Sequence, residues 1–455
     1  MFKSNLGLNK VINTSASIMM LLFITGCTAI TGHKQSLNDF DVNLKNQKCD
    51  YTMIDEKIKS DDDTILWGIQ GGSLARNCMN YKKSNELFDE AEKKYKEDVD
   101  KDGIVSNAGE SVKSVLVNDN INDYEGNTYE KIMVNTYKAL NFASINDHAS
   151  ARVEFNRALD RQRRALEYYE NELKEKKNQK NDANNKKIAQ NNKTQEVIYK
   201  KYNNLLNDFE AYPDFVNPFT TYISGIYFML NNDFIKARDL LKESSSMDPK
   251  NEQIKKDFEL VNNYSSLKKT NANYAWVIYE NGQSMVKDEL RVDIPLFLVT
   301  NKVMYTGIAL PQITERKNSY NYLLVNNNKT VEICNMDNVI KTEFKKRFPA
   351  IVTEKIISTI VKTIAQKEIQ DRTGILGGLA SAVYQGMTNK ADVRSWTALP
   401  KNFQSTRVEI NSKPIEIKND RGEIIKSVII PKGKNAIIYV KSQNLGNNNV
   451  HEILF

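Results

Sequence analysis

The sequence predicts a fold of class α + (α+β), with an all-α domain of helical repeats at 46–270 followed by a β-rich α+β domain at 271–455. Two observations carry this prediction. Up to about residue 270, apolar residues recur with the 3.6-residue period of amphipathic helices. From Asn273 onward, short apolar or alternating segments bounded by turn residues replace that period, which is typical of strands. The chain has 455 residues, 40% of them hydrophobic, which is enough for both cores.

The N-terminus is typical of a bacterial lipoprotein signal. A weakly basic start precedes the apolar run 18–24, which is far shorter than the roughly 20 residues that span a bilayer. The run ends in Leu-Phe-Ile-Thr-Gly-Cys at 22–27, which resembles a lipobox, and in that class the cysteine thiol is lipidated. We therefore expect a signal peptide at 1–26, a lipidated Cys27 and a polar tether at 27–45. A plain secretory signal or a short anchor is the alternative.

The residues after Cys27 indicate which membrane holds the lipid. In lipoproteins of enteric-type bacteria, an Asp at this place favours retention in the inner membrane, whereas this chain has Thr28 and Ala29. We therefore expect attachment to the outer membrane with the body facing the periplasm. Two or three acyl chains, such as palmitate, give stable anchoring that a single chain does not.

The net charge is mildly positive. The formal value of +7 falls by two, to +5, when Lys3 and Lys10 leave with the signal, and acidic clusters such as 61–63 interleave with basic residues. Proteins that bind nucleic acid carry a strongly basic face. We therefore expect protein and membrane partners and no nucleic acid.

Four cysteines limit the covalent and metal chemistry. With Cys27 taken by the lipid, Cys49, Cys78 and Cys334 remain, an odd number for an oxidising compartment. Cys49 and Cys78 lie in one region of the sequence and are candidates for a disulfide across neighbouring helices. The alternative is three free, buried thiols. Because the chain has three histidines and no CxxC motif, we expect no zinc and no cofactor.

Three segments of the helical domain share the spacing of the tetratricopeptide repeat, a helix pair with small residues where the helices cross. The clearest copy, at 217–249, has Gly225 at the small position of its first helix and Ala237 on its second. A second copy covers 132–164, and a degenerate one covers 65–97. The alternative is an ordinary helical bundle in which the alanine spacing is coincidental.

A charged helical protrusion is expected near 165–205, between the second and third copies. The segment is rich in Lys, Asn, Gln and Glu, and its flanks have helical patterns. We expect two helices joined by a solvated tip. Contact of a basic tip with anionic lipid or glycan is the alternative.

The C-terminal domain is expected to hold a sheet interrupted by a helical insert near 350–390. The insert is predicted from an apolar stripe that includes Ile351, Ile356 and Ile360. Strands are expected at 275–279, 290–294, 302–309, 320–325, 330–333, 406–410, 415–418, 424–430 and 436–441.

Three further segments carry a family resemblance. They are Tyr124-Glu125-Gly126-Asn127-Thr128-Tyr129-Glu130-Lys131, Tyr279-Glu280-Asn281-Gly282 and Arg394-Ser395-Trp396-Thr397-Ala398-Leu399-Pro400. These segments resemble an uncharacterised family of bacterial tetratricopeptide-repeat-containing lipoproteins, and the resemblance covers most of the mature chain. It implies an envelope location, helical repeats and a β-rich C-terminal half, and it implies no catalytic activity.

The acidic motif Asp98-Val99-Asp100-Lys101-Asp102-Gly103 resembles the start of a calcium loop, in which alternate carboxylates converge on one cation. The pattern then departs from such a loop, because the twelfth position is Gly109 and the carboxylate follows one place later. We therefore expect no metal at Asp98, Asp100 and Asp102.

The first functional hypothesis is a scaffold for protein–protein interactions in cell-envelope assembly or regulation. Repeat arrays present a concave groove that binds partners. Candidate groove residues are Tyr137, Asn141, Tyr222 and Tyr227, with a further docking element at Arg394 and Trp396. Ordinary packing in the interior is the alternative for all six.

The second hypothesis is an envelope enzyme that acts on peptidoglycan or another glycan through the C-terminal domain. Such chemistry needs a carboxylate pair or an activated nucleophile. The nearest candidates are Glu280 and Asp293 on strand ends, and their spacing does not indicate a pair. We therefore favour the scaffold and expect no enzymatic activity.

Overall fold

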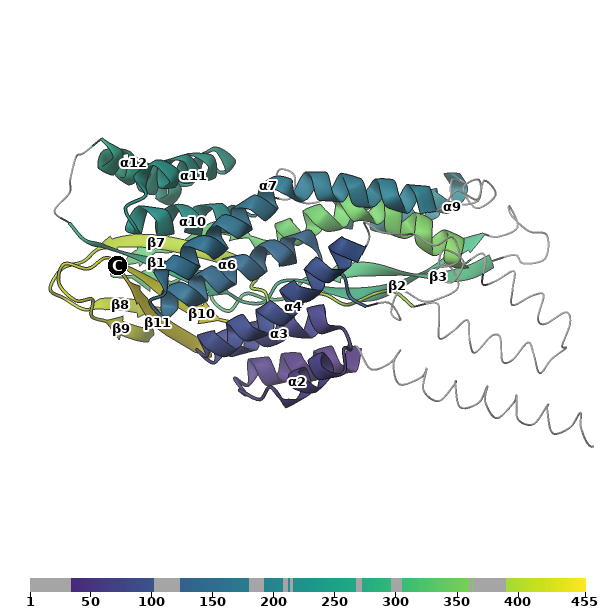
Figure 1. Ribbon diagram of the computed structural model, residues 1–455, viewed down its shortest axis with the longest axis horizontal. Helices are drawn as coiled ribbons and strands as arrows, with labels where there is room; N and C mark the ends of the chain where they lie inside the picture. Colours follow the sequence, from purple (N-terminus) through teal and green to yellow (C-terminus); the bar gives the residue numbers. More distant parts are fainter. Residues whose placement is uncertain are drawn as a thin grey trace, which may run out of the picture.

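The computed structural model describes residues 34–101, 123–179, 192–207, 212, 216–266, 272–295, 305–359, 362 and 390–455. A helical region comes first along the chain and a sheet-rich region follows (Figure 1). The two regions pack side by side and share one large hydrophobic core.

The first helix covers residues that the sequence analysis assigned to a tether. Residues 34–45 are helical, and Leu37, Phe40 and Leu44 are buried along one face of this N-terminal helix. Their spacing of three and four positions places them in a single apolar stripe. The expected tether at 27–45 is therefore wrong from residue 34 onward.

Within the described residues, nine further helices precede the first strand. They are α2 (Thr52–Lys59), α3 (Thr64–Asn77), α4 (Tyr81–Lys101), α6 (Thr128–Ser144), α7 (His148–Gln179), α9 (Asn192–Asn207), α10 (Pro218–Leu230), α11 (Phe234–Met247) and α12 (Glu252–Ser265). Local signals set their starts. At α10 the side chain of Asn217 accepts hydrogen bonds from the backbone of Phe219 and Thr220, and at α6 Asn127 and Glu130 form a capping box.

Three helix pairs share one connection geometry. In α3–α4, α6–α7 and α10–α11, short turns pass through a residue with positive φ: Met79, Asn146 and Asn232, respectively. Such turns return the chain along the helix it has just left, so the two members of each pair pack against each other.

The described part of the sheet-rich region contains three sheets. Sheet A has the order β11-β10-β1-β7-β6, with β1 and β10 parallel and the other pairs antiparallel; sheet C has the order β5-β4-β8-β9, and β2 and β3 form a two-stranded ribbon. The strands are β1 (Tyr274–Asn281), β2 (Val286–Pro295), β3 (Tyr305–Thr314), β4 (Leu324–Val325), β5 (Asn328–Lys329), β6 (Val331–Asn335), β7 (Asn402–Glu409), β8 (Ile415–Lys418), β9 (Ile424–Val428), β10 (Ala436–Ser442) and β11 (Asn448–Leu454).

Sheet A is the middle layer between the helices and sheet C (Figure 1). Alternate residues of β1 point to its two sides. Trp276 and Ile278 belong to the core shared with the helices, whereas Val277 and Tyr279 belong to a second core shared with sheet C. Because both faces are covered, β1 is an almost continuous apolar run.

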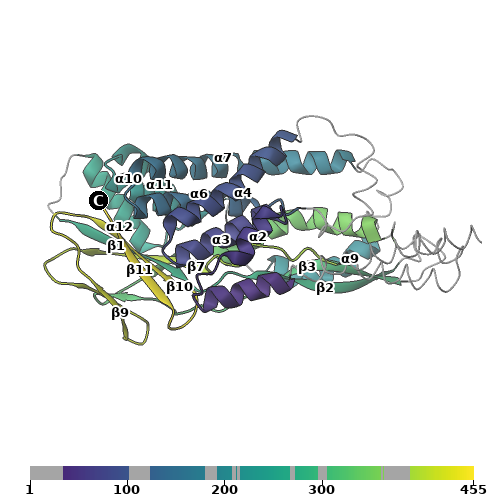
Figure 2. The same ribbon diagram turned by 60° about the horizontal axis from the view of Figure 1, so that its bottom comes forward.

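An arm extends from the body, formed by the β2–β3 ribbon, α9, the second half of α7 and a helix over residues 336–359. Figures 1 and 2 both place the ribbon and α9 at the end of the long axis opposite sheet C. Tyr202 of α9 packs its ring 4.3 Å from Phe348 and donates a hydrogen bond to the carbonyl of Pro311 at 2.9 Å. The helices expected near 165–205 are thus packed within the arm.

The helical insert begins earlier than the sequence indicated, at residue 336, and its remainder at 363–389 lies outside the described residues. In the part of the chain that the structure describes, no helix is both long enough and apolar enough to cross a bilayer.

Candidate functional site

The predicted groove residues lie in the interior of the molecule. Tyr137, Asn141 and Tyr222 have no exposed surface, and Tyr227 is 1% exposed. The side chains of sheet A fill the face of the helical region to which they point. The structure therefore corrects the expectation of an open groove, because the protein's own sheet covers that face.

Glu280 of β1 is the centre of the polar contacts across this interface. Its carboxylate accepts hydrogen bonds from the hydroxyls of Tyr137 on α6 and Tyr439 on β10, both at 2.8 Å. Lys441 forms an ion pair with the same carboxylate at 3.3 Å. The guanidinium of Arg76 on α3 lies 4.5 Å from the ring centroid of Tyr137. Helix α6 is thus joined to β1 and β10 through one buried carboxylate, and α3 packs against the same cluster through Arg76.

Two opposing effects act on the ionisation of Glu280. Burial raises its pKa, whereas the charges of Lys441 and Arg76 and the two tyrosine hydroxyls lower it, and the net pKa is below the usual glutamate value. Burial and the nearby Glu280 charge hold the pKa of Tyr137 well above its ordinary value. At neutral pH the cluster is therefore a carboxylate that accepts hydrogen bonds from two neutral tyrosines.

A second buried carboxylate has a similar arrangement between α10, α12 and sheet A. Asp257 of α12 accepts hydrogen bonds from the Tyr222 hydroxyl at 2.7 Å and from the Trp276 indole at 3.0 Å. Arg407 of β7 donates to the same carboxylate at 2.8 Å. Tyr222 is thus held between α12 and the sheet. Tyr227, the remaining groove candidate, donates to the carbonyl of His148 at 2.7 Å.

Arg394 and Trp396 lie on a segment of the sheet-rich region that runs between the first helices. Arg394 bonds to Asp63 at 2.7 Å, and the Trp396 indole donates to the Ser73 hydroxyl at 2.8 Å. The backbone of Trp396 donates to Glu130 at 2.9 Å. Both side chains are buried, so the predicted docking element is part of the interior.

Sequence reasoning missed Glu343, which joins the two regions at a helix terminus. Its carboxylate accepts hydrogen bonds from the backbone of Thr128 at 2.8 Å and of Tyr129 at 3.0 Å. These N–H groups open α6 and have no partner within the helix, so a carboxylate there is stabilising. The sequence signal was a buried acid on the apolar stripe of the 336–359 helix, which no local pattern connects to α6.

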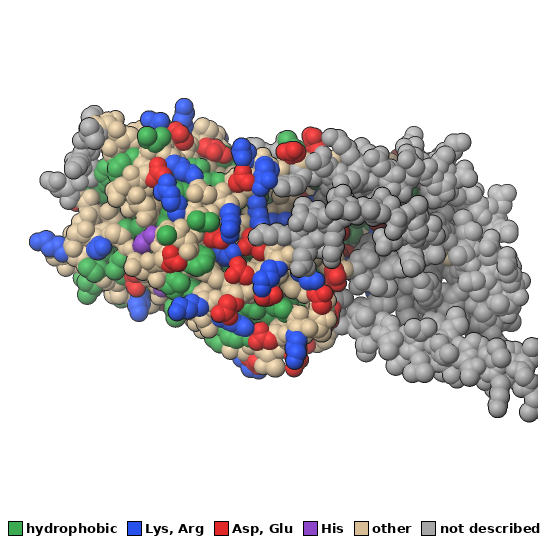
Figure 3. Space-filling model, viewed as in Figure 1, with side chains coloured by type: hydrophobic (Ala, Val, Ile, Leu, Met, Phe, Trp, Pro, Cys, Tyr) green, Lys and Arg blue, Asp and Glu red, His purple; other side chains and the backbone are tan. Residues whose placement is uncertain are grey.

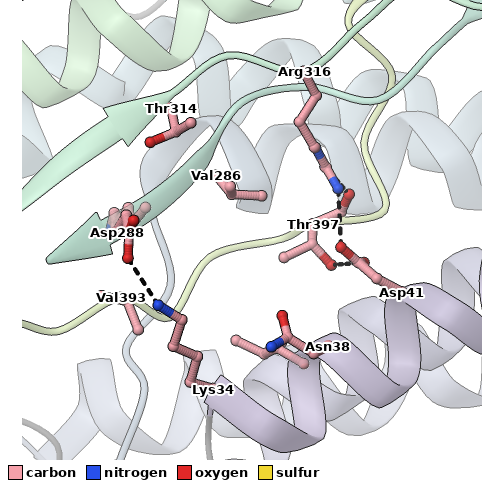
Figure 4. Close-up of a pocket in the computed structure, with 11 residues that line it drawn as sticks. Lys34, Asn38, Asp41, Val286, Asp288, Thr314, Arg316, Val393 and Thr397 are labelled. Carbon is pink, nitrogen blue, oxygen red and sulfur yellow. Dashed lines mark hydrogen bonds and ion pairs between the residues drawn. The ribbon is translucent and has the colours of Figure 1, made fainter.

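A cavity of about 180 Å³ lies between the N-terminal helix, the start of the ribbon and the segment 393–397 (Figure 4). Lys34 pairs with Asp288 across it at 2.9 Å, and Asp41 pairs with Arg316 at 3.0 Å. The cavity is smaller than pockets that enclose drug-sized ligands. Its charged groups hold the N-terminal helix against the ribbon, so we interpret it as part of that contact.

The remaining candidates do not form a reactive site. Glu280 is 1% exposed and Asp293 is exposed on the ribbon, so the two acids lie in different environments on different sheets. Asp98 and Asp100 belong to α4, and Asp102 lies outside the described residues. Among the residues that the structure describes, no cluster of His, Cys, Asp and Glu is suited to a metal ion.

The cysteines divide into a bonded pair and a buried thiol. Cys49 and Cys78 form a disulfide, with Cα atoms 6.0 Å apart. It connects the segment after the N-terminal helix to the end of α3. Cys334 is buried, and burial raises the pKa of its thiol far above the ordinary value, so it is not a reactive thiolate. Cys27 lies outside the described residues.

Comparison of the chain with models of protein families, with curated proteins and with solved structures finds no match in any of the three.

Proposed function

We propose that this protein is an outer-membrane lipoprotein, anchored through Cys27 and facing the periplasm, that serves as a scaffold for other envelope proteins. In this proposal the pairs α3–α4, α6–α7 and α10–α11 are tetratricopeptide-like repeats. The family resemblance of the sequence agrees with this proposal, and partner recognition takes place on the outer face of the helices.

Close helix crossings support the assignment of repeats. A Cβ atom on Gly72 of α3 would lie 2.3 Å from the Phe88 ring on α4, and one on Gly225 of α10 would lie 2.8 Å from Leu241 on α11. Only glycine allows this approach. Small residues at the crossing of paired helices are the feature by which the sequence suggested repeats.

The burial of one face of the helices against sheet A is the observation that directs the proposal to the outer helical surface. If the helix pairs are repeats, sheet A occupies their groove. The opposite, outer face of the helices is then the one left for partners. Figure 3 shows this side of the molecule, with basic and acidic side chains interspersed and apolar side chains between them. The surface is therefore of mixed character, as in many transient interfaces.

One apolar pair stands out on this surface. Ile235 of α11 is 69% exposed, and Val153 of α7 is 48% exposed. The two helices are bridged beside them, because Arg152 pairs with Asp233 and Lys236 donates to Asn156. We call Val153, Ile235 and these bridging residues the outer patch. An exposed apolar pair on a braced, rigid surface suits protein recognition.

Crosslinking in intact cells, followed by capture of the protein and mass spectrometry, tests this proposal. We expect a short, reproducible set of envelope proteins that is lost in the double variant Val153→Asp with Ile235→Asp. The matched control is Ile424→Asp on sheet C, where the side chain is 61% exposed. Unchanged capture by the double variant, or equal loss in the control, would refute the outer patch as the scaffold surface.

A further inference from the structure

The N-terminal helix fixes where the membrane anchor leaves the body. Leu37, Phe40 and Leu44 are buried, and Phe40 packs edge-on against Trp67 of α3 with ring centroids 6.4 Å apart. Asp41 pairs with Arg316, and both side chains are largely shielded from solvent. The helix is therefore part of the rigid body from its first turn, which begins at Lys34.

The chain between Lys34 and Cys27 is short. Seven residue steps separate them, and a fully extended chain covers at most about 25 Å over that length. The lipid on Cys27 is part of the function proposed above, and this inference rests on it. Such a lipid holds the membrane within about 25 Å of Lys34.

Lys34 lies beside the ribbon, because its ammonium pairs with Asp288 of β2 at 2.9 Å. From Asp288 to Pro295, at the far end of β2, the strand rises about 24 Å. The anchor can therefore reach about as far as the end of the ribbon. Sheet C lies at the opposite end of the long axis in both views (Figures 1 and 2).

Two helices of the arm, α9 and 336–359, carry the excess of basic charge expected of a surface near phospholipid, whereas β2 carries two basic and three acidic side chains. The α9 segment carries three lysines and one glutamate, and residues 336–359 carry five basic and three acidic side chains. Lys200, Lys201 and Lys345 are exposed. Basic side chains next to a membrane anchor are attracted to anionic headgroups.

From these constraints we infer that the arm faces the phospholipid leaflet that holds the lipid of Cys27, and that sheet C projects away from it. The ligand of this surface is the anionic headgroup layer of that leaflet. The outer patch is then held close to the membrane by the short anchor, where it meets the periplasmic parts of other envelope proteins.

Energy transfer from labelled protein to acceptor-labelled lipid tests this orientation. Full-length lipidated protein is reconstituted in vesicles of phosphatidylethanolamine and phosphatidylglycerol, with one donor dye at Asp293→Cys on the ribbon or at Ile429→Cys beyond β9. Both positions are exposed, the latter by 77%. The native disulfide and the buried Cys334 leave the introduced thiol as the labelling site.

We expect strong energy transfer to the lipid from a donor at position 293, and none from a donor at position 429. Equal transfer from both positions, or stronger transfer from 429, overturns the orientation while leaving the anchor in place. The Cys27→Ala protein separates the two proposals, because it lacks the lipid attachment site and should show no transfer from either position. If the protein that keeps Cys27 also stays free of the vesicles, the anchor itself is refuted, and the orientation with it.

Discussion

Replacing Glu280 by Gln is the most informative perturbation of the interface between the helices and sheet A. The substitution keeps the size of the side chain but removes the charge that faces Lys441 and that accepts hydrogen bonds from Tyr137 and Tyr439. Breaking one side of a buried ion pair costs about 3–5 kcal/mol. Burial lowers the pKa of Lys441, so that lysine can release its proton and reduce the cost. We expect a loss of about 3 kcal/mol in the free energy of unfolding at pH 7.

The pH dependence of this loss follows from the lowered pKa of Glu280. A carboxyl with a depressed pKa in the folded state adds stability that is present above its unfolded pKa and is lost as the pH falls through the folded one. The difference between the native protein and Glu280→Gln should therefore be constant above about pH 5 and shrink at lower pH, where the native carboxyl also becomes neutral.

Denaturation in urea, followed by fluorescence at several pH values, measures both effects. The matched control is Glu416→Gln on β8, a half-exposed acid paired with Lys418, for which we expect a change of less than about 0.5 kcal/mol. A change in Glu280→Gln as small as in this control would refute the reasoning, because it would show that the carboxylate is not the buried joint between α6 and the sheet.

Three further predictions concern other contacts. Gly72→Ala should destabilise by about 1–3 kcal/mol, because its Cβ would meet the Phe88 ring at 2.3 Å; a native-like denaturation midpoint would contradict the close crossing. Loss of the Cys49–Cys78 disulfide in the double Ser variant should cost about 3 kcal/mol in the same assay, since the bridge closes a loop of sequence separation 29. Burial, and then the charge of Arg76, lower the pKa of His451 to about 3. Below about pH 6.5 the unfolded chain therefore binds a proton at this histidine, whereas the folded protein does not. Stability should therefore fall between pH 6.5 and 4, and His451→Gln should remove part of that slope; an unchanged slope would show that His451 is protonated in the fold.

Local sequence patterns predicted the elements whose residue types suit only one kind of secondary structure and burial. The apolar run of β1 suits only a strand covered on both faces, and the sequence placed it within two residues of its bounds. The N-terminal helix was missed because its three buried apolar residues are separated by polar ones, so composition suggested a tether. β11 was missed for a similar reason: Asn448, Asn449 and Glu452 make it a polar strand at the edge of sheet A.

The environment of the groove residues was not predictable from the sequence. Tyrosine and asparagine suit an open binding surface and a buried polar interface equally well, because each has an apolar body and a polar end. What distinguishes the two is the position of the buried carboxylates: Glu280 lies 143 residues from Tyr137 in the sequence, and Asp257 on α12 lies 35 residues from Tyr222. Spacing along the chain does not report such contacts.

Hydroxyl-radical footprinting of the native, full-length protein tests the central claim most directly. If sheet A covers the inner face of the helices, Tyr137, Tyr222 and Trp396 should remain unmodified while Met79, which is 51% exposed, is oxidised. Modification of Tyr137 and Tyr222 at rates close to that of Met79 would contradict the account, because it would show that the face is open to solvent and available to partners.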